Sequence, residues 1–225
     1  GPSAGLWLTF PEGTREVTLR MALSTTDLEG ARLNHQAELA GVDQETLLAQ
    51  VEAQWRDLLG RIRVSSSDAA QRRTFYTALY HSALMPSRHD DVDGRYRGVD
   101  QEIHTADFNY YSDLSLWDTF RTSHPLYTLI WPDVQRDALR SLLRMYRDGG
   151  SLPRWPLAHG YTSGMVGTPA IQMLAESWQK GLQDFNVDLA YEASRRHATE
   201  QMPDASRTRV EENDALGYLS DESTS

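Results

Sequence analysis

The sequence predicts a mainly α-helical fold that follows a short β-rich start, and two patterns of apolar residues indicate this. Over residues 6–25 apolar and polar side chains alternate, as at Val17, Leu19 and Met21, which is the period of a half-buried strand. After about residue 30 the apolar spacing becomes three and four residues, the period of a helix. Because a two-stranded ribbon is marginal alone, we expect the early strands to belong to a larger sheet.

Capping residues and prolines divide the helical part into segments. The expected helices are one around Leu47–Ile62, one that Asp68 caps and that ends before Pro86, one from Ser112 or Asp113, one from Pro132 to Gly149-Gly150, one from Thr168-Pro169 and one from Asn186. Residues 199–215 are expected to be loop-rich. Successive helices with loops of unequal length fit an α/α toroid or a larger bundle, and the pattern does not choose between them.

Composition and charge exclude several classes of protein. The 225 residues carry 22 Lys plus Arg and 32 Asp plus Glu, so the net charge of −10 disfavours a general nucleic-acid binder. No apolar run approaches the roughly 18 residues of a membrane-spanning helix. With 40% hydrophobic residues the chain is not expected to be disordered, and with no cysteine it has no disulfide, thiolate metal site or cysteine nucleophile. No export leader is visible at its start.

The polar stretch from His89 to Asp100 partly fits a calcium-binding EF-hand loop. Asp91, Asp93 and Gly94 fall on the third, fifth and sixth positions of such a loop. The first position is His89 instead of Asp, and the twelfth is Asp100 instead of the bidentate Glu. We therefore expect an Asp-Gly turn followed by a short extended Arg-Tyr-Arg stretch.

Two segments carry candidate sugar-binding residues. In the first, Asp118 follows Trp117, so a carboxylate could accept hydrogen bonds from sugar hydroxyls while the indole covers the apolar face of the ring. The alternative is a surface pair of Asp118 and Arg121 beside a core Trp. In the second, prolines flank Trp155, and Tyr161 follows in what reads as a rigid loop between helices. The alternative there is a structural loop whose Trp closes the end of the core.

Common catalytic signatures are missing from the sequence. The seven histidines include no pair at helical metal-ligand spacing, and H-E-x-x-H, G-x-S-x-G and Walker A patterns do not occur. Acidic pairs are frequent, but a glycosidase pair is defined by separation in space, which the sequence does not give.

Four blocks of this sequence resemble successive blocks of glycoside hydrolase family 92, in the same order and spacing. They are Arg73–Ser82, Asp91–Gly98, Ser115–Arg121 and Gly149–Ala158. The resemblance implies a calcium-dependent, exo-acting α-mannosidase that inverts the anomeric centre, with an N-terminal β-sandwich and a C-terminal (α/α)6 barrel. It implies that residues 1–30 end the sandwich, residues 31–67 form a linker helix region, and residues 68–225 form the first, incomplete part of the catalytic barrel.

The chain also departs from the family pattern. The family's general-acid Glu lies in a Glu-Gly-Asn block, its base Asp in an Asn-Asp-Asp-x-Gly-Gln-Met block, and a His-Glu pair contacts the sugar; none of these occurs here. The resemblance therefore implies substrate contacts by Trp117 and Asp118, with Trp155 and Tyr161 as neighbours, and assigns no catalytic acid or base and no metal ligand.

The resemblance also sets expectations for partners and location. It implies a mannose-containing glycan as substrate, a role in N-glycan degradation, and a secreted, periplasmic or cell-surface bacterial protein. The alternative is a non-catalytic carbohydrate-binding or scaffolding protein on the same fold. No oligomeric state is assigned.

Overall fold

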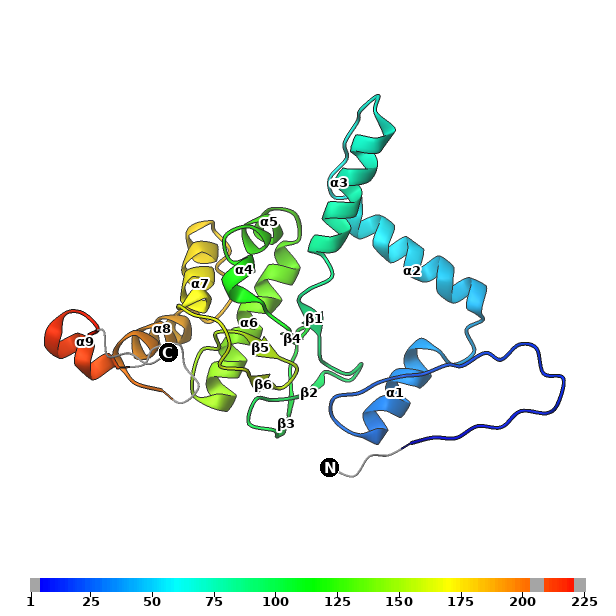
Figure 1. Cartoon of the computed structure of the whole chain (residues 1–225), viewed down its shortest axis with the longest axis horizontal. Coiled ribbons are helices and arrows are strands. Elements are labelled where there is room, and N and C mark those ends of the chain that lie inside the picture. The colour runs from blue at the N-terminus through cyan, green and yellow to red at the C-terminus, as the bar shows by residue number, and fades with distance from the viewer. Residues whose placement is uncertain (1–4, 203–208, 221–225) are drawn as a thin grey trace.

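The computed structural model describes residues 5–202 and 209–220, and the described chain is mainly helical (Figure 1). The helices are α1 (Leu28–Glu38), α2 (Gln44–Leu59), α3 (Ala69–Ser82), α4 (Leu116–Thr119), α5 (Ser123–Ile130), α6 (Pro132–Gly149), α7 (Pro169–Gln179), α8 (Val187–Thr199) and α9 (Val210–Leu216). Three short antiparallel pairs complete it: β1 (Ser87–Arg88) with β4 (Tyr111–Ser112), β2 (Arg95–Arg97) with β3 (Ile103–Thr105), and β5 (Pro156–Leu157) with β6 (Gly160–Tyr161).

The main core surrounds α6, against which α5, α7, α8 and β4 pack. Leu139, Leu142 and Met145 on this helix are completely buried, and Met173 of α7 and Ala193 of α8 meet the same cluster. Figure 1 shows α6 running through the middle of the body that α4 to α8 form. Because α6 contacts so many elements, its two ends decide where the neighbouring loops begin.

Both ends of α6 follow from the sequence, as predicted. Pro132 occupies the first turn, where its fixed φ suits the helix and its missing N–H is not needed. Gly150 ends the helix in the left-handed region at φ 85°, and its N–H donates to the Tyr146 carbonyl. The next residues, Ser151 and Leu152, are then completely buried.

Replacing Gly150 with alanine should lower the free energy of unfolding by about 1 kcal/mol, because a left-handed backbone is costly for a residue with a Cβ. A Cβ at Gly150 would have nothing within 4 Å, so the loss reports backbone conformation alone. Gly160→Ala is the matched control, since its nearest neighbour would be a carbonyl oxygen at 3.9 Å and its φ is not positive. Chemical denaturation of both variants checks this, and equal losses would contradict it.

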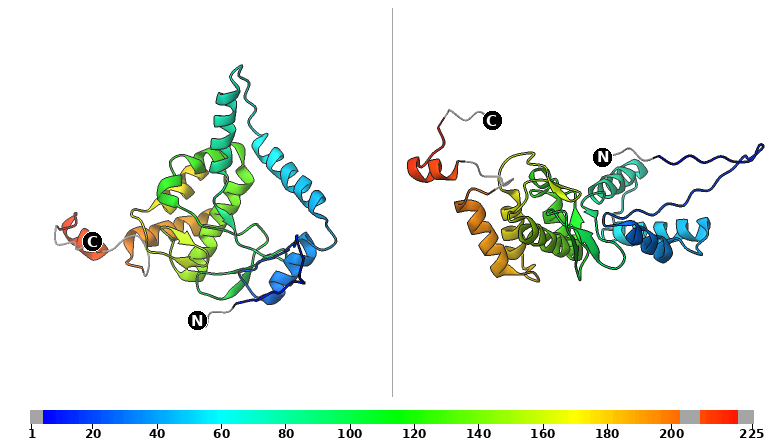
Figure 2. Two further views of the ribbon diagram at one scale, coloured as in Figure 1. Left: turned by 45° about the vertical axis from the view of Figure 1, so that its right-hand side comes forward. Right: turned by 90° about the horizontal axis from the view of Figure 1, so that it is seen from below.

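A smaller core joins the N-terminal helices to α5. Leu79 of α3 is buried with Tyr127 and Trp131, and the Trp131 indole N–H donates to the Leu58 carbonyl of α2 at 3.1 Å. The two predicted helices of this region are confirmed, and the Asp68 carboxylate caps α3 by accepting from the Ala70 N–H at 2.8 Å. Both views in Figure 2 show α2 and α3 projecting from the body of the molecule.

The predicted early strands are not formed in the structure. Residues 5–23 are extended but make no ladder, and Trp7, Leu19 and Leu23 are 87%, 64% and 84% exposed. The physical reason is that an alternating segment needs a partner sheet to bury its apolar face, and the described residues supply none. The N-terminal sandwich stays a prediction.

Two other boundaries differ from expectation. Ser112 lies in β4 and Asp113 is left-handed at φ 56°, so the helix expected there begins only at Leu116. The stretch expected to be loop-rich contains α9, which begins at Val210, a residue only 6% exposed. One buried apolar anchor within a polar stretch is too little for a helical period to be recognised. Residues 203–208 lie outside the described chain.

A buried carboxylate joins the start of α1 to the loop between β1 and β2. Asp91 is 2% exposed and accepts hydrogen bonds from the hydroxyls of Ser24 and Thr26 and from the Asn34 amide, at 2.7 Å for Ser24 and 2.8 Å for Asn34. The Asn34 side chain also accepts from the Val92 N–H at 2.9 Å. Asp91 is therefore a structural link and not a ligand of an EF-hand.

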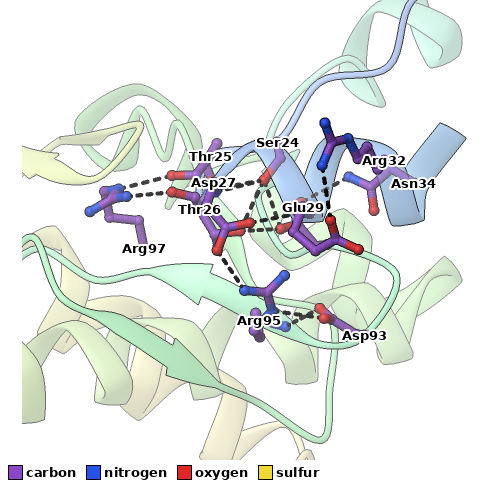
Figure 3. A network of polar contacts seen from close by, with 12 residues as sticks. Ser24, Thr25, Thr26, Asp27, Glu29, Arg32, Asn34, Asp93, Arg95 and Arg97 are labelled. Carbon is purple, nitrogen blue, oxygen red and sulfur yellow. Dashed lines mark hydrogen bonds and ion pairs between the residues drawn. The ribbon is translucent and has the colours of Figure 1, made fainter.

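The same loop confirms the predicted Asp-Gly turn and extended stretch. Gly94 is left-handed at φ 81° and its N–H donates to the Asp91 carbonyl, and β2 follows directly. Arg95 contacts the carboxylates of Asp27 and Asp93, and Arg97 donates to the Thr25 carbonyl at 2.9 Å (Figure 3). Both arginines thus hold α1 beside β2.

In the described part of the chain, no helix is both long and apolar enough to cross a bilayer.

Candidate functional site

The first sequence-predicted pair lies on the short helix α4. Leu116 is completely buried and fixes this turn in the core, so that Trp117 is half-buried and Asp118 is exposed. The Asp118 carboxylate accepts a hydrogen bond from the Ser115 hydroxyl at 2.6 Å. The exposed carboxylate therefore keeps further lone pairs open to other donors.

Arg121 does not form the surface pair with Asp118 that the sequence left open. Its guanidinium lies over the rings of Trp117 and Phe120, 4.7 and 4.8 Å from the two ring centroids. Cation–π contacts of this kind are worth about 0.5–1 kcal/mol at exposed sites. The arginine thus covers the two aromatic rings and makes no ion pair with Asp118.

The loop from Ser163 to Gly167, here named the 163–167 loop, contacts both tryptophans of the predicted site. A Cβ on Gly167 would lie 3.4 Å from the Trp117 ring, and one on Gly164 would lie 3.7 Å from the Trp155 ring. The structure therefore brings Trp117 and Trp155 to one loop, although 38 residues separate the two indoles in the sequence.

Trp155 and its neighbours leave several polar atoms without partners. The indole N–H of Trp155, Nε of Arg154 and Nδ1 of His159 are buried and make no hydrogen bond within the described residues. Buried polar atoms are normally hydrogen-bonded. Three unpaired ones within six residues indicate that this segment makes hydrogen bonds to a group outside the described residues. A polar ligand, water or polypeptide could satisfy them.

Tyr161 is committed to the backbone. Its hydroxyl lies 2.7 Å from the carbonyl oxygens of both Met145 and Ser151, and its ring packs against the main core. A Cβ on Gly149 would meet this hydroxyl at 2.5 Å, so only glycine allows the approach. Tyr161 therefore ties the β5–β6 hairpin to the end of α6, and its hydroxyl is engaged there.

Asp113, which the sequence did not single out as a site residue, joins the two candidate segments. One carboxylate oxygen accepts from the Ala158 N–H at 2.8 Å and the other lies 3.1 Å from Nε2 of His89. Burial raises the pKa of Asp113, but the hydrogen bond from Ala158 and the contacts with Ser87 and His89 outweigh it and bring the pKa below its ordinary value. Nothing in the sequence marks this role; in the structure Asp113 is left-handed at φ 56°, a region that Asp tolerates.

A second acidic group with a perturbed pKa lies at the end of α6. Burial raises the pKa of Asp148, whose carboxylate accepts from the Tyr96 hydroxyl at 2.9 Å. His104 lies between this carboxylate and that of Asp100, 3.9 and 2.9 Å away respectively. The Asp148 side chain is only 8% exposed, so this cluster anchors β2 and β3 to α6 and offers no accessible proton donor.

Three cavities of the described chain lie elsewhere. One of about 340 Å³ runs along α6 towards α8, one of about 350 Å³ lies between α6 and the β1–β2 loop, and one of about 450 Å³ lies between residues 16–20 and residues 39–47; none of the three includes Trp117 or Asp118. The candidate site is made by α4, the 163–167 loop and the Trp155 segment, with Asp118 exposed on its surface. Such a surface can bind and orient a sugar but cannot by itself exclude water from it.

Comparisons with known proteins identify the family. The model of the Glycosyl hydrolase family 92 catalytic domain matches residues 30–225. A family GH92 α-mannosidase of Bacteroides thetaiotaomicron, also solved in complex with mannoimidazole, is 34% identical with a TM-score of 0.78 over 84% of this chain and 25% of its own. A family GH92 inverting mannosidase of the same organism is 29% identical with a TM-score of 0.81 over 88% of this chain and 28% of its own.

The chain thus spans about a quarter of the length of these similar structures. No curated protein matches it. The match to the family model covers most of the chain and includes all four blocks in which the sequence resembles the family. The chain therefore belongs to glycoside hydrolase family 92.

Proposed function

We propose that this chain is part of an exo-acting α-mannosidase that removes terminal mannose from glycans, and that it supplies substrate contacts and not the acid or base. The observation that carries the proposal is the match to the catalytic-domain model over residues 30–225. The succession of half-buried Trp117 and exposed Asp118 on α4 supports it, because an indole face can cover the apolar face of a hexose and a carboxylate can accept from its hydroxyls.

In this proposal Asp118 binds and orients the terminal sugar. A carboxylate that accepts from two ring hydroxyls fixes both the position and the rotation of the ring, and orientation alone can lower a barrier by several kcal/mol. Trp117 removes the apolar C–H face of the sugar ring from water, and the Arg121 guanidinium helps to hold the indole in place. Trp155 contributes a second apolar wall across the 163–167 loop.

The expected chemistry is inverting hydrolysis within an (α/α)6 barrel that follows an N-terminal sandwich. A carboxylic acid protonates the leaving oxygen while a carboxylate about 6.5–9.5 Å away activates a water on the opposite face. Asp148 and Asp113 are too enclosed for either role. We therefore place the acid and base on other segments of the whole protein.

We also propose that the whole enzyme needs calcium and acts in the periplasm, at the cell surface or outside the cell on N-glycans. Among the described residues no group of three or more His, Cys, Asp or Glu side chains could hold a metal ion. We therefore name no ligand of the calcium, and no step here depends on it. Loss of mannoside hydrolysis on EDTA treatment, restored by calcium, is the expected result.

Asp118→Ala in the full-length protein should lower kcat/KM for an α-mannoside by about 10²–10³-fold, since each charged hydrogen bond is worth about 1.5–3 kcal/mol. Asp188→Ala is the matched control, because Asp188 is an equally exposed carboxylate on α8. Mannose release by both variants checks the prediction. Unchanged kcat/KM in Asp118→Ala would remove the proposed site.

A non-catalytic carbohydrate-binding or scaffolding protein is the second candidate, because the acid, base and His-Glu blocks of the family do not occur in this sequence. It predicts that the full-length protein binds mannosides through Asp118 and Trp117 without releasing mannose. Binding by calorimetry together with an assay for free mannose separates the two candidates.

A further inference from the structure

The 163–167 loop has an unusual backbone. Ser163, Met165 and Gly167 are all left-handed, with φ of 52°, 61° and 79°. For Ser and Met this region costs about 1 kcal/mol or more each, and such conformations persist only where surrounding contacts impose them. Interactions with other residues must therefore stabilise this loop conformation by more than its cost.

Arg154 provides these interactions as two hydrogen bonds to the loop backbone. One terminal nitrogen donates to the Met165 carbonyl at 3.0 Å and the other to the Ser163 carbonyl at 2.6 Å. The two acceptors are the carbonyls of Ser163 and Met165, the two left-handed residues of this loop that are not glycine. A planar guanidinium can hold two carbonyls at once in a fixed fork, which a lysine ammonium cannot do with the same geometry.

The far end of the loop lies on the predicted site. Gly167 approaches Trp117 so closely that a Cβ there would lie 3.4 Å from the indole ring. Arg121 is the other neighbour over the ring, at 4.7 Å. The position of Trp117, and of the adjacent Asp118, thus depends on where the loop places Gly167.

We propose that Arg154 is a positioning residue of the Trp117–Asp118 site, and that it acts by holding the 163–167 loop against the indole. The inference rests on the proposed function, because it assumes that Trp117 and Asp118 bind the sugar. Arg154 itself touches neither the sugar nor the reacting atoms. Without the two hydrogen bonds from Arg154, Ser163 and Met165 relax to ordinary backbone angles. Gly167 then moves away from the indole, and Trp117 loses one of the contacts that orient it.

Arg154→Lys in the full-length protein tests the inference. Because the site binds the sugar before and during reaction, KM for an α-mannoside should rise about tenfold while kcat changes less than about threefold. Arg195→Lys is the control, since Arg195 is an exposed arginine on α8, and it should change neither constant. A lower kcat with unchanged KM and a lower melting temperature would mean that Arg154 only stabilises the fold, and would overturn the proposal.

A double-mutant cycle with Trp117→Ala shows whether Arg154 acts through the indole. In the Trp117→Ala background, Arg154→Lys should change KM by less than about twofold. The same tenfold rise in both backgrounds would overturn the inference and leave the proposed function intact. If Trp117→Ala alone left KM unchanged, the proposed site itself would fail.

Gly167→Ala displaces the loop from its other end and keeps the inference testable if Arg154→Lys does not fold. Alanine would be strained at φ 79°, and its Cβ would only reach van der Waals contact with the Trp117 ring at 3.4 Å. Relief of that strain should shift the loop against the indole, so KM should rise as it does for Arg154→Lys. Gly160→Ala is its control. An unchanged KM in Gly167→Ala would contradict the proposal that the 163–167 loop positions the Trp117 indole.

Discussion

Asp91→Ala should lower the free energy of unfolding by about 3–5 kcal/mol. The change removes one acceptor from the hydroxyls of Ser24 and Thr26 and from the Asn34 amide, at a cost of about 1–3 kcal/mol each before relaxation. Chemical denaturation measures the loss. Limited proteolysis should show faster cleavage over residues 24–34, because this carboxylate holds the start of α1.

Two further variants make this prediction specific. Asp91→Asn should cost less than half as much, because an amide can accept from Asn34 and donate to the hydroxyl oxygens. Gly30→Ala should be about as harmful as Asp91→Ala, because its Cβ would lie 2.3 Å from the Asp91 carboxylate. Asp107→Ala is the control, since Asp107 is exposed. Equal small losses in all four variants would show that the link is not needed for stability.

Acidification from pH 7 to about pH 4 should destabilise the fold through His124. This residue is 3% exposed, with Nδ1 2.8 Å from the Gln135 side-chain oxygen, whose amide donates to the Ser177 hydroxyl. Burial lowers the pKa of His124 to about 4 from an ordinary 6.5. Between these values the unfolded chain binds a proton that the folded chain does not, so stability falls as the pH falls, by roughly 3 kcal/mol in total.

His124→Asn isolates this contribution, because an asparagine amide can still donate to Gln135 but does not titrate in this range. The loss of unfolding free energy between pH 7.5 and pH 4 should be smaller in His124→Asn than in the unchanged chain by roughly 3 kcal/mol. His81→Asn serves as the control, since His81 is exposed. Parallel pH dependences of all three proteins would show that His124 does not carry the effect.

Helix positions could be predicted where local signals agree. Pro132 and Gly150 bound α6, Asp68 caps α3, and Asn186 caps α8 by accepting from the Leu189 N–H at 2.9 Å. Each of these depends on residues within one turn of each other. The short helix α5 escaped prediction because Pro125 and the polar residues around it interrupt the apolar period.

The candidate site was predictable only in part. Adjacent residues such as Trp117 and Asp118 are visible in the sequence as a pair, but their degree of exposure depends on the burial of Leu116 and on a loop 50 residues later. The roles of Asp113 and Arg154 depend on contacts with backbone groups of distant residues, which any side chain can present. Sequence spacing therefore carries no signal for them.

The carboxylate of Asp113 has a mechanical consequence. Trp117 lies four residues beyond Asp113 along the chain, and Trp155 lies three residues before Ala158, whose N–H that carboxylate holds. This hydrogen bond ties the segment that carries Trp117 to the segment that carries Trp155, in addition to the burial of Leu116 and the approach of the 163–167 loop. Because each indole lies within four residues of that one bond, a shift of either segment should carry the other indole with it.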